Sequence, residues 1–245
     1  MPSKNLTFGN IKSVIKTSFL DWRGKICAVL FLGGCNFRCP YCHNKELVIC
    51  PQEMENVSFD EVTRIIMKNP DWIDGVVITG GEPTLDPELI PLIEAIRDMD
   101  LLVKIDTNGS CPHILESLIE RNLIYYIAMD FKAPLEKDVY ALCSGINSPP
   151  ISKIKQSIDL LLQNKVDYEF RVTLCPSLLG EREILAMAHS IKGARRFTLQ
   201  NFRAHATLDP NFENERSYSK NELNRFRELI LPFVQECNVI APHQP

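Results

Sequence analysis

Short apolar runs alternate with amphipathic segments along most of this chain. A continuous apolar run bounded by glycine or polar residues is typical of a strand buried on both faces of a parallel sheet. Residues 26–32 are the clearest example, and they are followed by Gly33 and Gly34. Six strand-like segments are predicted, at residues 26–32, 75–79, 101–106, 125–131, 167–174 and 196–200, and the segment 167–174 alternates between polar and apolar residues.

Between these strands the apolar residues recur at helical spacing. In residues 151–164, for example, Ile154 and Ile158 fall on one side of the expected helix. Ser58 and Glu61 form a capping box that predicts the start of another helix. The same spacing predicts further helices at residues 87–98, 114–121, 184–191 and 220–237.

This alternation of strands and helices predicts an α/β fold with a parallel sheet and right-handed crossovers. A closed eight-stranded barrel usually needs about 250 residues. The chain has 245 residues and only six predicted strand–helix repeats. We therefore expect a partial TIM barrel of about (β/α)6, with parallel strands and one open side.

We expect one domain over residues 1–245, because no long linker or change of composition divides the chain. Its core is expected at about 19–202. The N-terminal extension, 1–18, includes a segment that predicts a hairpin or an edge strand. The C-terminal part, 203–245, is expected to form a loop and a closing helix. The polar stretch 202–217 predicts a mobile loop.

Composition narrows the function classes. The formal net charge of −4 gives no basic footprint for a nucleic acid, so none is expected as a partner. No apolar run approaches the roughly 18 residues that predict a membrane helix. The first twenty residues lack the apolar stretch of a signal peptide, so a cytoplasmic protein without membrane attachment is expected.

The nine cysteines fall into two groups. Cys35, Cys39 and Cys42 form a C-x3-C-x2-C motif, one thiol short of the usual four-cysteine iron–sulfur set. Three thiolates could hold three irons of a [4Fe–4S] cluster and leave the fourth iron open to a ligand. The other six are scattered and are predicted to be reduced structural thiols: Cys27, Cys50, Cys111, Cys143, Cys175 and Cys237.

A zinc site is the alternative interpretation of this motif, with His43 as the fourth ligand and the chain acting as a zinc-binding interaction module. Against it, His43 directly follows Cys42, whereas zinc ligands are normally two or more residues apart.

Other unusual residues follow the predicted strands at their carboxyl ends, where parallel α/β folds collect their chemistry. The two glycines before Glu82 would let a ligand approach the backbone, whose carbonyls can accept hydrogen bonds from an ammonium group. Singly, Asp106 could be a turn residue, and Arg171 could pair with Glu169 or with a ligand carboxylate. These residues are expected to converge on one rim: Gly80, Gly81, Glu82, Asp106, Thr107, Asn108, Asp130 and Lys132.

Together, residues 18–24, 29–35 and 41–44 resemble the radical S-adenosylmethionine (SAM) superfamily, and within it the activases of glycyl radical enzymes. The similarity is strong over about 18–132. Within this group, the sequence resembles the anaerobic ribonucleoside-triphosphate reductase activating proteins and the pyruvate formate-lyase activating enzyme.

The resemblance implies a role for each matching residue. Cys35, Cys39 and Cys42 would hold the [4Fe–4S] cluster, whose open iron would bind the amino and carboxylate groups of SAM. No catalytic side chain is expected beyond the cluster and SAM ligands. The implied cofactor-binding residues are Tyr41 against the adenine, Gly80, Gly81 and Glu82 at the methionyl amino group, Lys132 and Arg171 at its carboxylate, and also Asp106, Asn108 and Asp130. A monovalent cation is implied at Asp106, Thr107 and Asp130.

The implied reaction is reductive cleavage of SAM, followed by removal of the α-hydrogen of a glycine in a glycyl radical enzyme. Anaerobic ribonucleotide reductase is the expected partner, and a flavodoxin or ferredoxin the expected electron donor. The alternative within the superfamily is an enzyme that acts on a small molecule, similar to 7-carboxy-7-deazaguanine synthase.

Overall fold

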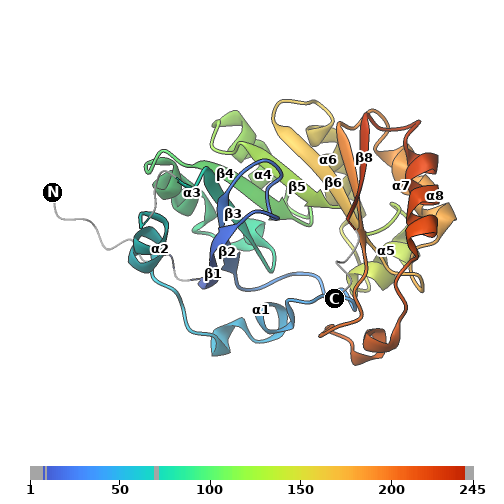
Figure 1. The fold of residues 1–245 in the computed structure, drawn as a ribbon, viewed down its shortest axis with the longest axis horizontal. Helices are drawn as coiled ribbons and strands as arrows, with labels where there is room; N and C mark the ends of the chain where they lie inside the picture. Colours follow the sequence, from blue (N-terminus) through green and yellow to red (C-terminus); the bar gives the residue numbers. More distant parts are fainter. Residues whose placement is uncertain (1–7, 9, 69–71, 241–245) are drawn as a thin grey trace. The chain divides into compact units, whose positions relative to one another are not determined.

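The computed structural model describes residues 8, 10–68 and 72–240. Its strands are hydrogen-bonded in chain order from β1 to β8, so the sheet is open within the described residues (Figure 1). Their bounds are β1 Ile11–Ser18, β2 Cys27–Leu32, β3 Gly75–Gly80, β4 Leu102–Thr107, β5 Tyr126–Asp130, β6 Asp167–Leu174, β7 Arg196–Asn201 and β8 Glu236–Ile240. The six predicted strands correspond to β2–β7.

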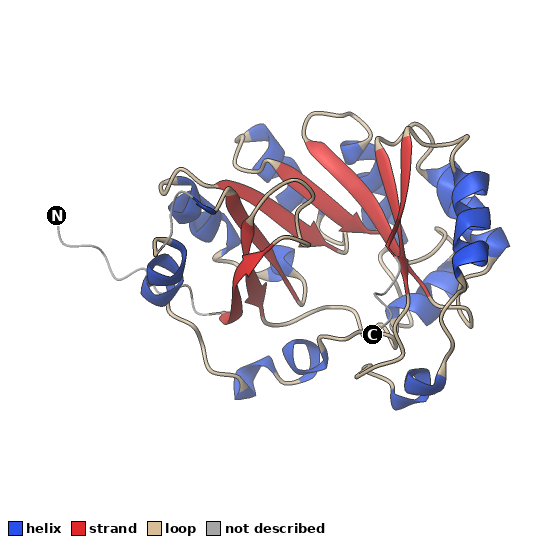
Figure 2. Cartoon of the chain, in the orientation of Figure 1, coloured by secondary structure: helices blue, strands red, loops and turns tan. Residues whose placement is uncertain are grey.

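Helices alternate with these strands, which confirms the α/β class (Figure 2). The α-helices are α1 Lys45–Ile49, α2 Phe59–Ile66, α3 Leu89–Arg97, α4 Pro112–Glu120, α5 Lys137–Ser144, α6 Ile151–Leu161, α7 Glu181–Ser190 and α8 Lys220–Ile230. The described residues also form the short 3-10 helices η1 Pro51–Glu53, η3 Pro83–Leu85 and η4 Pro210–Asn214. Ser58 caps α2 as predicted, because its side chain accepts a hydrogen bond from the amide of Glu61.

Two strands flank the predicted core. The expected N-terminal edge strand is β1, which pairs antiparallel with β2. At the other end, β8 pairs in parallel with β7. The prediction of one helix over 220–237 was wrong, since α8 ends at Ile230 and residues 236–240 form β8. Pro232 explains the break, because proline has no backbone N–H and clashes with the preceding helical turn.

The described chain forms two compact units. Unit 1 consists of residues up to 36, 46–107 and 113–127, and unit 2 of 37–45, 108–112 and the chain from 128 onward. The single domain with its predicted boundaries stays a prediction. Residues 1–7, 9 and 241–245 of its terminal segments lie outside the described residues.

Unit 1 contains β1–β4 and the start of β5. In this unit Cys27 of β2 stands in register with Gly75 of β3, which stands in register with Leu102 of β4. The inner residues of β2 and β3 are fully buried, since helices cover the sheet and α3 packs against β4. The three parallel strands therefore end at the same edge, after Leu32, Gly80 and Thr107.

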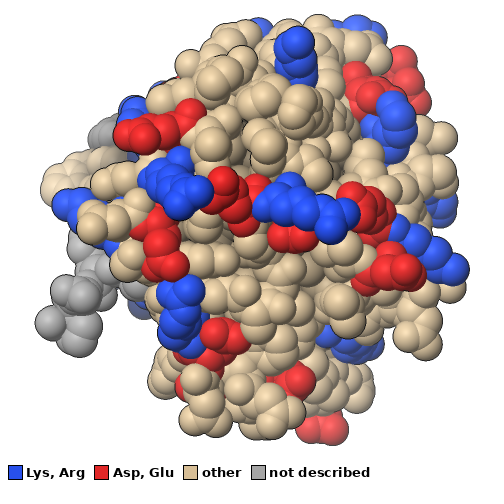
Figure 3. Space-filling model, turned by 90° about the vertical axis from the view of Figure 1, so that its right-hand side faces the viewer, with Lys and Arg blue, Asp and Glu red and all other residues tan. Residues whose placement is uncertain are grey.

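Unit 2 contains the end of β5 and β6–β8. Residues of β6 alternate strictly between buried and half-buried positions, so Arg171 lies on the half-buried face and Phe170 in the core. Helix α8 packs against α7 and against β7 and β8 (Figure 1). On the face drawn in Figure 3, acidic and basic side chains alternate and do not separate by sign.

Candidate cofactor site

The first part of the site is a close contact between two backbone segments in unit 1. The amide of Gly81 donates to the carbonyl of Leu32 (2.8 Å), and the amide of Glu82 donates to the carbonyl of Gly34 (2.7 Å). A Cβ placed on Gly81 would lie 1.9 Å from the Gly34 oxygen, so no other residue fits there. The end of β3 is thereby fixed against the segment that leads into Cys35.

Glu82 is 2% exposed and acts inside unit 1. Its Oε1 accepts hydrogen bonds from the Thr84 amide (3.1 Å), the Thr84 hydroxyl and the Thr107 hydroxyl (2.7 Å). The carboxylate thus caps η3 and joins β3 to β4. Backbone carbonyls of residues 80–82 are the groups that remain suited to an incoming ammonium, and that role stays a prediction.

Asp106 and Thr107 close β4 on opposite faces of the strand. The Asp106 carboxylate pairs with Lys104, whose Nζ lies 3.1 Å from Oδ1. Thr107 is buried and bonded to Glu82. Asn108, the next residue, belongs to unit 2, where its Oδ1 accepts from the amide of Ser110 (2.9 Å) and shapes the turn before α4.

In unit 2, the loop that carries Cys39 and Cys42 is held by a segment distant in sequence. The Cys42 amide donates to the Cys39 carbonyl (3.0 Å), which forms a tight turn. The amides of Leu208 and Asp209 donate to the carbonyls of Cys42 and Pro40 (2.8 and 2.9 Å). The irregular stretch 202–217 therefore supports the cysteine loop, and its mobility stays a prediction.

Helix α5 supports the same loop and was not predicted from the sequence. The amide of Arg38 donates to the carbonyl of Ser144 at the end of α5 (2.8 Å). Gly145 follows with φ of 67°, and a Cβ there would lie 1.9 Å from the Arg38 oxygen. The signal that could have revealed this contact is the glycine just after a short amphipathic run, which is typical of a helix end.

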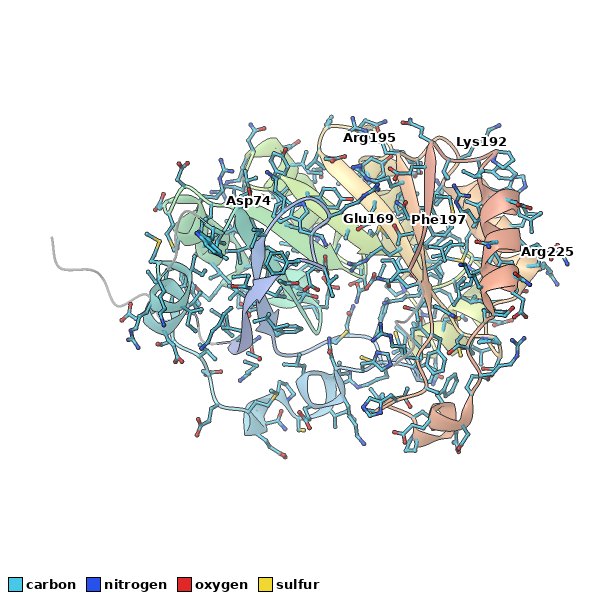
Figure 4. The ribbon with its side chains drawn as sticks, in the orientation of Figure 1. Asp74, Glu169, Lys192, Arg195, Phe197 and Arg225 are labelled. Carbon is cyan, nitrogen blue, oxygen red and sulfur yellow. The ribbon has the colours of Figure 1, made fainter. Side chains whose placement is uncertain are left out.

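Three charged side chains of unit 2 form two ion pairs that share one carboxylate. Nε of Arg171 lies 2.9 Å from Oδ1 of Asp130, and Nζ of Lys132 lies 3.2 Å from Oδ2. Burial alone would raise the pKa of Asp130, but Arg171 and Lys132 lower it to about 2. The partner of Arg171 is thus Asp130; Glu169, labelled on β6 in Figure 4, accepts a hydrogen bond from Thr198 (2.6 Å).

The Lys132 ammonium also interacts electrostatically with the cysteine loop. Burial alone would lower the pKa of Lys132, whereas the nearby Asp130 carboxylate and the sulfurs of Cys39 and Cys42 raise it above its ordinary value. A fixed positive charge beside a thiol favours the thiolate, which is the form that binds metal. This corner of unit 2 is suited to thiolate ligands.

Tyr41, which lies between Cys39 and Cys42 in the sequence, is buried. Burial raises the pKa of its phenol, and Cys39, Cys143 and Asp130 act in the same direction, so the hydroxyl is neutral. No group in the described part of the chain hydrogen-bonds this hydroxyl. Tyr41 is thus packed as a core residue would be, while its contact with adenine stays a prediction.

The thiolates of Cys35, Cys39 and Cys42 have the donor chemistry that a [4Fe–4S] cluster needs. Among residues 8, 10–68 and 72–240, no three His, Cys, Asp or Glu side chains are grouped to share one ion. Nε2 of His43, the alternative zinc ligand, lies 3.0 Å from the carbonyl oxygen of Arg203. In a cluster each thiolate binds a different iron, so the cysteines need not meet at one point.

Comparison with known proteins defines the class to which this chain belongs. The radical SAM superfamily model matches residues 29–198, and the chain is a member of that superfamily. Within it, the chain belongs with the activating enzymes of glycyl radical enzymes. It is 31% identical over 228 residues to a protein of Methanocaldococcus jannaschii whose name classes it as such an enzyme, with 91% of this chain and 92% of that protein covered.

Two further relatives support the class and the fold. The pyruvate formate-lyase-activating enzyme of Clostridium pasteurianum is 25% identical over 196 residues, which cover 78% of this chain and 79% of that protein. The structure of Streptococcus suis SuiB bound to S-adenosylmethionine superposes with a TM-score of 0.66 and 16% identity. It covers 88% of this chain and 52% of SuiB, and it supports the partial-barrel fold alone.

Membership confirms several predictions. The chain is a radical SAM oxidoreductase, and the cofactors of its superfamily are a [4Fe–4S] cluster and SAM. The zinc-binding interaction module is therefore not supported. The helices within the described ranges include none that is long and apolar enough to cross a membrane.

Proposed function

We propose that this protein uses SAM to remove the α-hydrogen of a glycine in a glycyl radical enzyme, with anaerobic ribonucleotide reductase as the partner. The observation that carries the proposal is the position of Lys132 and Arg171. Both cations pair with Asp130, and Cys39 and Cys42 lie near enough to Lys132 to raise its pKa. A carboxylate that arrives next to the cysteine loop would find a positive charge already in place.

When bound, the cluster and SAM supply one-electron reductive cleavage and a carbon radical able to take a hydrogen atom from a glycine Cα. The chain's own part is to bind, orient and shield. Cys35, Cys39 and Cys42 would hold the cluster, and Lys132 and Arg171 would orient the methionyl carboxylate.

The remaining predicted contacts divide by chemistry. Carbonyls of Gly80, Gly81 and Glu82 would accept hydrogen bonds from the methionyl amino group, and Tyr41 would lie against the adenine. Asp106, Asn108 and Asp130 stay in the proposed site as residues that shape it. The resemblance also implies a monovalent cation at Asp106, Thr107 and Asp130.

The electron donor and the compartment belong to the same proposal. We expect a flavodoxin or a ferredoxin to reduce the cluster, and we expect no nucleic acid or membrane among the partners. A cytoplasmic location follows from the need to keep nine cysteines reduced.

The test is anaerobic reconstitution of the holoenzyme with iron, sulfide, dithionite and SAM, with and without anaerobic ribonucleotide reductase. We expect SAM cleavage and a SAM-dependent glycyl doublet in the electron paramagnetic resonance spectrum of the reductase. Cleavage without any radical on this or another glycyl enzyme would overturn the proposal and favour a small-molecule substrate, as in a 7-carboxy-7-deazaguanine synthase-like enzyme.

A further inference from the structure

Lys104 is a charged residue in the interior of unit 1 that the proposed function does not use. It lies in the middle of β4 between Val103 and Ile105, both fully buried, and is itself only 2% exposed. A buried ammonium is costly unless it is paired and hydrogen-bonded. Its partners therefore indicate what it is for.

Three groups surround the ammonium. Nζ lies 3.1 Å from Oδ1 of Asp106, two residues along the same face of β4. It donates to the backbone carbonyl of Asp21 (2.5 Å). It also lies 5.7 Å from the ring centroid of Tyr126, a distance suited to a cation–π contact. One side chain thus joins β4, β5 and the loop between β1 and β2.

That loop, residues 18–22, is ordered around the same contact. The Ser18 hydroxyl donates to the Asp21 carboxylate (2.5 Å) and accepts from the amide of Leu20 (3.1 Å). Trp22 packs against Tyr126, with ring centroids 6.2 Å apart. The Lys104 ammonium therefore bonds to this loop at Asp21, directly before the buried Trp22.

Several charged residues act on the neighbouring thiol of Cys27. Asp21, Asp74 and Asp106 lie near enough to Cys27 to raise the pKa of its thiol, behind the larger effect of burial, and Lys104 opposes them. The pKa of Cys27 is raised to about 12, so the thiol stays neutral.

We propose that the Lys104 side chain supplies the positive charge at Asp106, where the family resemblance predicts a bound monovalent cation. Its ammonium pairs with the Asp106 side chain at the end of β4 and ties the loop of residues 18–22 to the sheet, so that no bound monovalent cation is needed at Asp106. Lys104 is a positioning residue, because it acts through Asp106 and the loop. The activity readout below rests on the proposed function.

The inference contrasts with the cation predicted from the family resemblance. Each carboxylate of that predicted set has a cationic side chain as a partner: Lys104 on Asp106, and Lys132 with Arg171 on Asp130. A metal cation at Asp106 would have to share its oxygens with the ammonium, and like charges in a buried site repel strongly.

The first test uses the wild-type holoenzyme and needs no variant. SAM cleavage is measured in buffers where choline replaces sodium or potassium. We expect rates within about twofold of one another, because the charge at Asp106 is supplied by the chain. A drop of about tenfold or more in choline would overturn the inference.

The second test compares Lys104→Met with Lys104→Arg and with Lys155→Met. Lys155 is a matched control, because it pairs with Asp159 on the exposed face of α6. We expect Lys104→Met to lose about tenfold or more of its SAM cleavage in choline and to recover part of it in potassium. Lys104→Arg and Lys155→Met should stay close to wild type in both buffers.

A third readout does not depend on activity. Crystals of the wild-type and Lys104→Met holoenzymes are soaked in thallium(I) acetate, and anomalous scattering locates the cation. We expect a peak at Asp106 in the variant alone. A peak there in the wild type would overturn the inference even if no SAM were cleaved, whereas absence of cleavage in every buffer would overturn only the proposed function.

Discussion

Lys132 and Asp130 share one face of the chain because side chains alternate along an extended segment. Arg171 reaches the same carboxylate from β6, so one acidic group holds two cations. The arrangement keeps Asp130 ionised: the pKa of its carboxyl falls from an ordinary 3.8 to about 2. A carboxyl with a lowered pKa stabilises the fold above its unfolded pKa, and that contribution is lost only as the pH falls toward 2.

The charge of Asp130 should therefore not change near neutral pH. We predict that SAM affinity of the wild-type holoenzyme shows no acid limb from Asp130 between about pH 5 and 8, because the carboxyl stays ionised throughout. Asp130→Asn should raise the dissociation constant for SAM by about tenfold or more, since two cations lose their shared partner. Isothermal titration at several pH values measures both effects. An acid limb near pH 6 that Asp130→Asn removes would contradict the assignment.

Cys39 and Cys237 have different predicted roles, which can be tested by comparing their alanine variants. We predict that Cys39→Ala loses most iron and sulfide and abolishes SAM cleavage, because Cys39 is a cluster ligand. Cys237 is buried in β8 with its pKa raised to about 12 by burial, so its thiol is a neutral core group. Cys237→Ala should keep its iron and more than half of its activity, at a stability cost of about 1 kcal/mol. Equal iron loss in both variants would show that Cys237 is not a structural thiol.

Among the helices and strands, the sequence predicted those that show a clear hydrophobic pattern. The strands β2–β7 are apolar or alternating segments, and α2, α3, α4, α6 and α7 each show a clear apolar face, so their patterns were sufficient. Short β8 was missed because only Cys237 in it is buried. The role of Lys104 was not predicted, because a single lysine within an apolar strand does not change the hydrophobic pattern. The rarity of buried lysines is the feature that could have drawn attention to it.

Helix α5 allows a test of how an element positions the site. We predict that Gly145→Ala lowers the cluster content about threefold or more, since its Cβ would meet the Arg38 carbonyl at 1.9 Å and push the cysteine loop. Gly193→Ala is the matched control. Gly193 also has a positive φ, 89°, but a Cβ there meets nothing within 4 Å.

Both variants should lose about 1 kcal/mol of stability from the left-handed backbone. Only Gly145→Ala should lose iron, measured by metal analysis of protein that remains folded by circular dichroism. Similar iron content in the two variants would mean that α5 does not position the cysteines.

For the whole molecule, the predicted cluster ligands are divided along the chain. Cys35 belongs to unit 1, whereas Cys39 and Cys42 belong to unit 2. The predicted SAM contacts are divided as well, with residues 80–82 in unit 1 and Asp130, Lys132 and Arg171 in unit 2. Sequence position at strand ends was the basis for predicting these residues. It could not show that Glu82 is used internally, because that depends on where the Thr84 and Thr107 hydroxyls lie.

This division makes hydrogen exchange a test of the SAM contacts. We predict that SAM added to the cluster-loaded protein slows amide exchange at residues 80–82 and at residues 130–132, because a ligand suppresses the local opening of each segment that it contacts. Peptides from α8 serve as the control and should not change. Protection confined to one unit would show that the other unit's predicted residues do not contact SAM. Because unit 1 is predicted to meet the amino group and unit 2 the carboxylate, methionine alone should reproduce part of the protection in both.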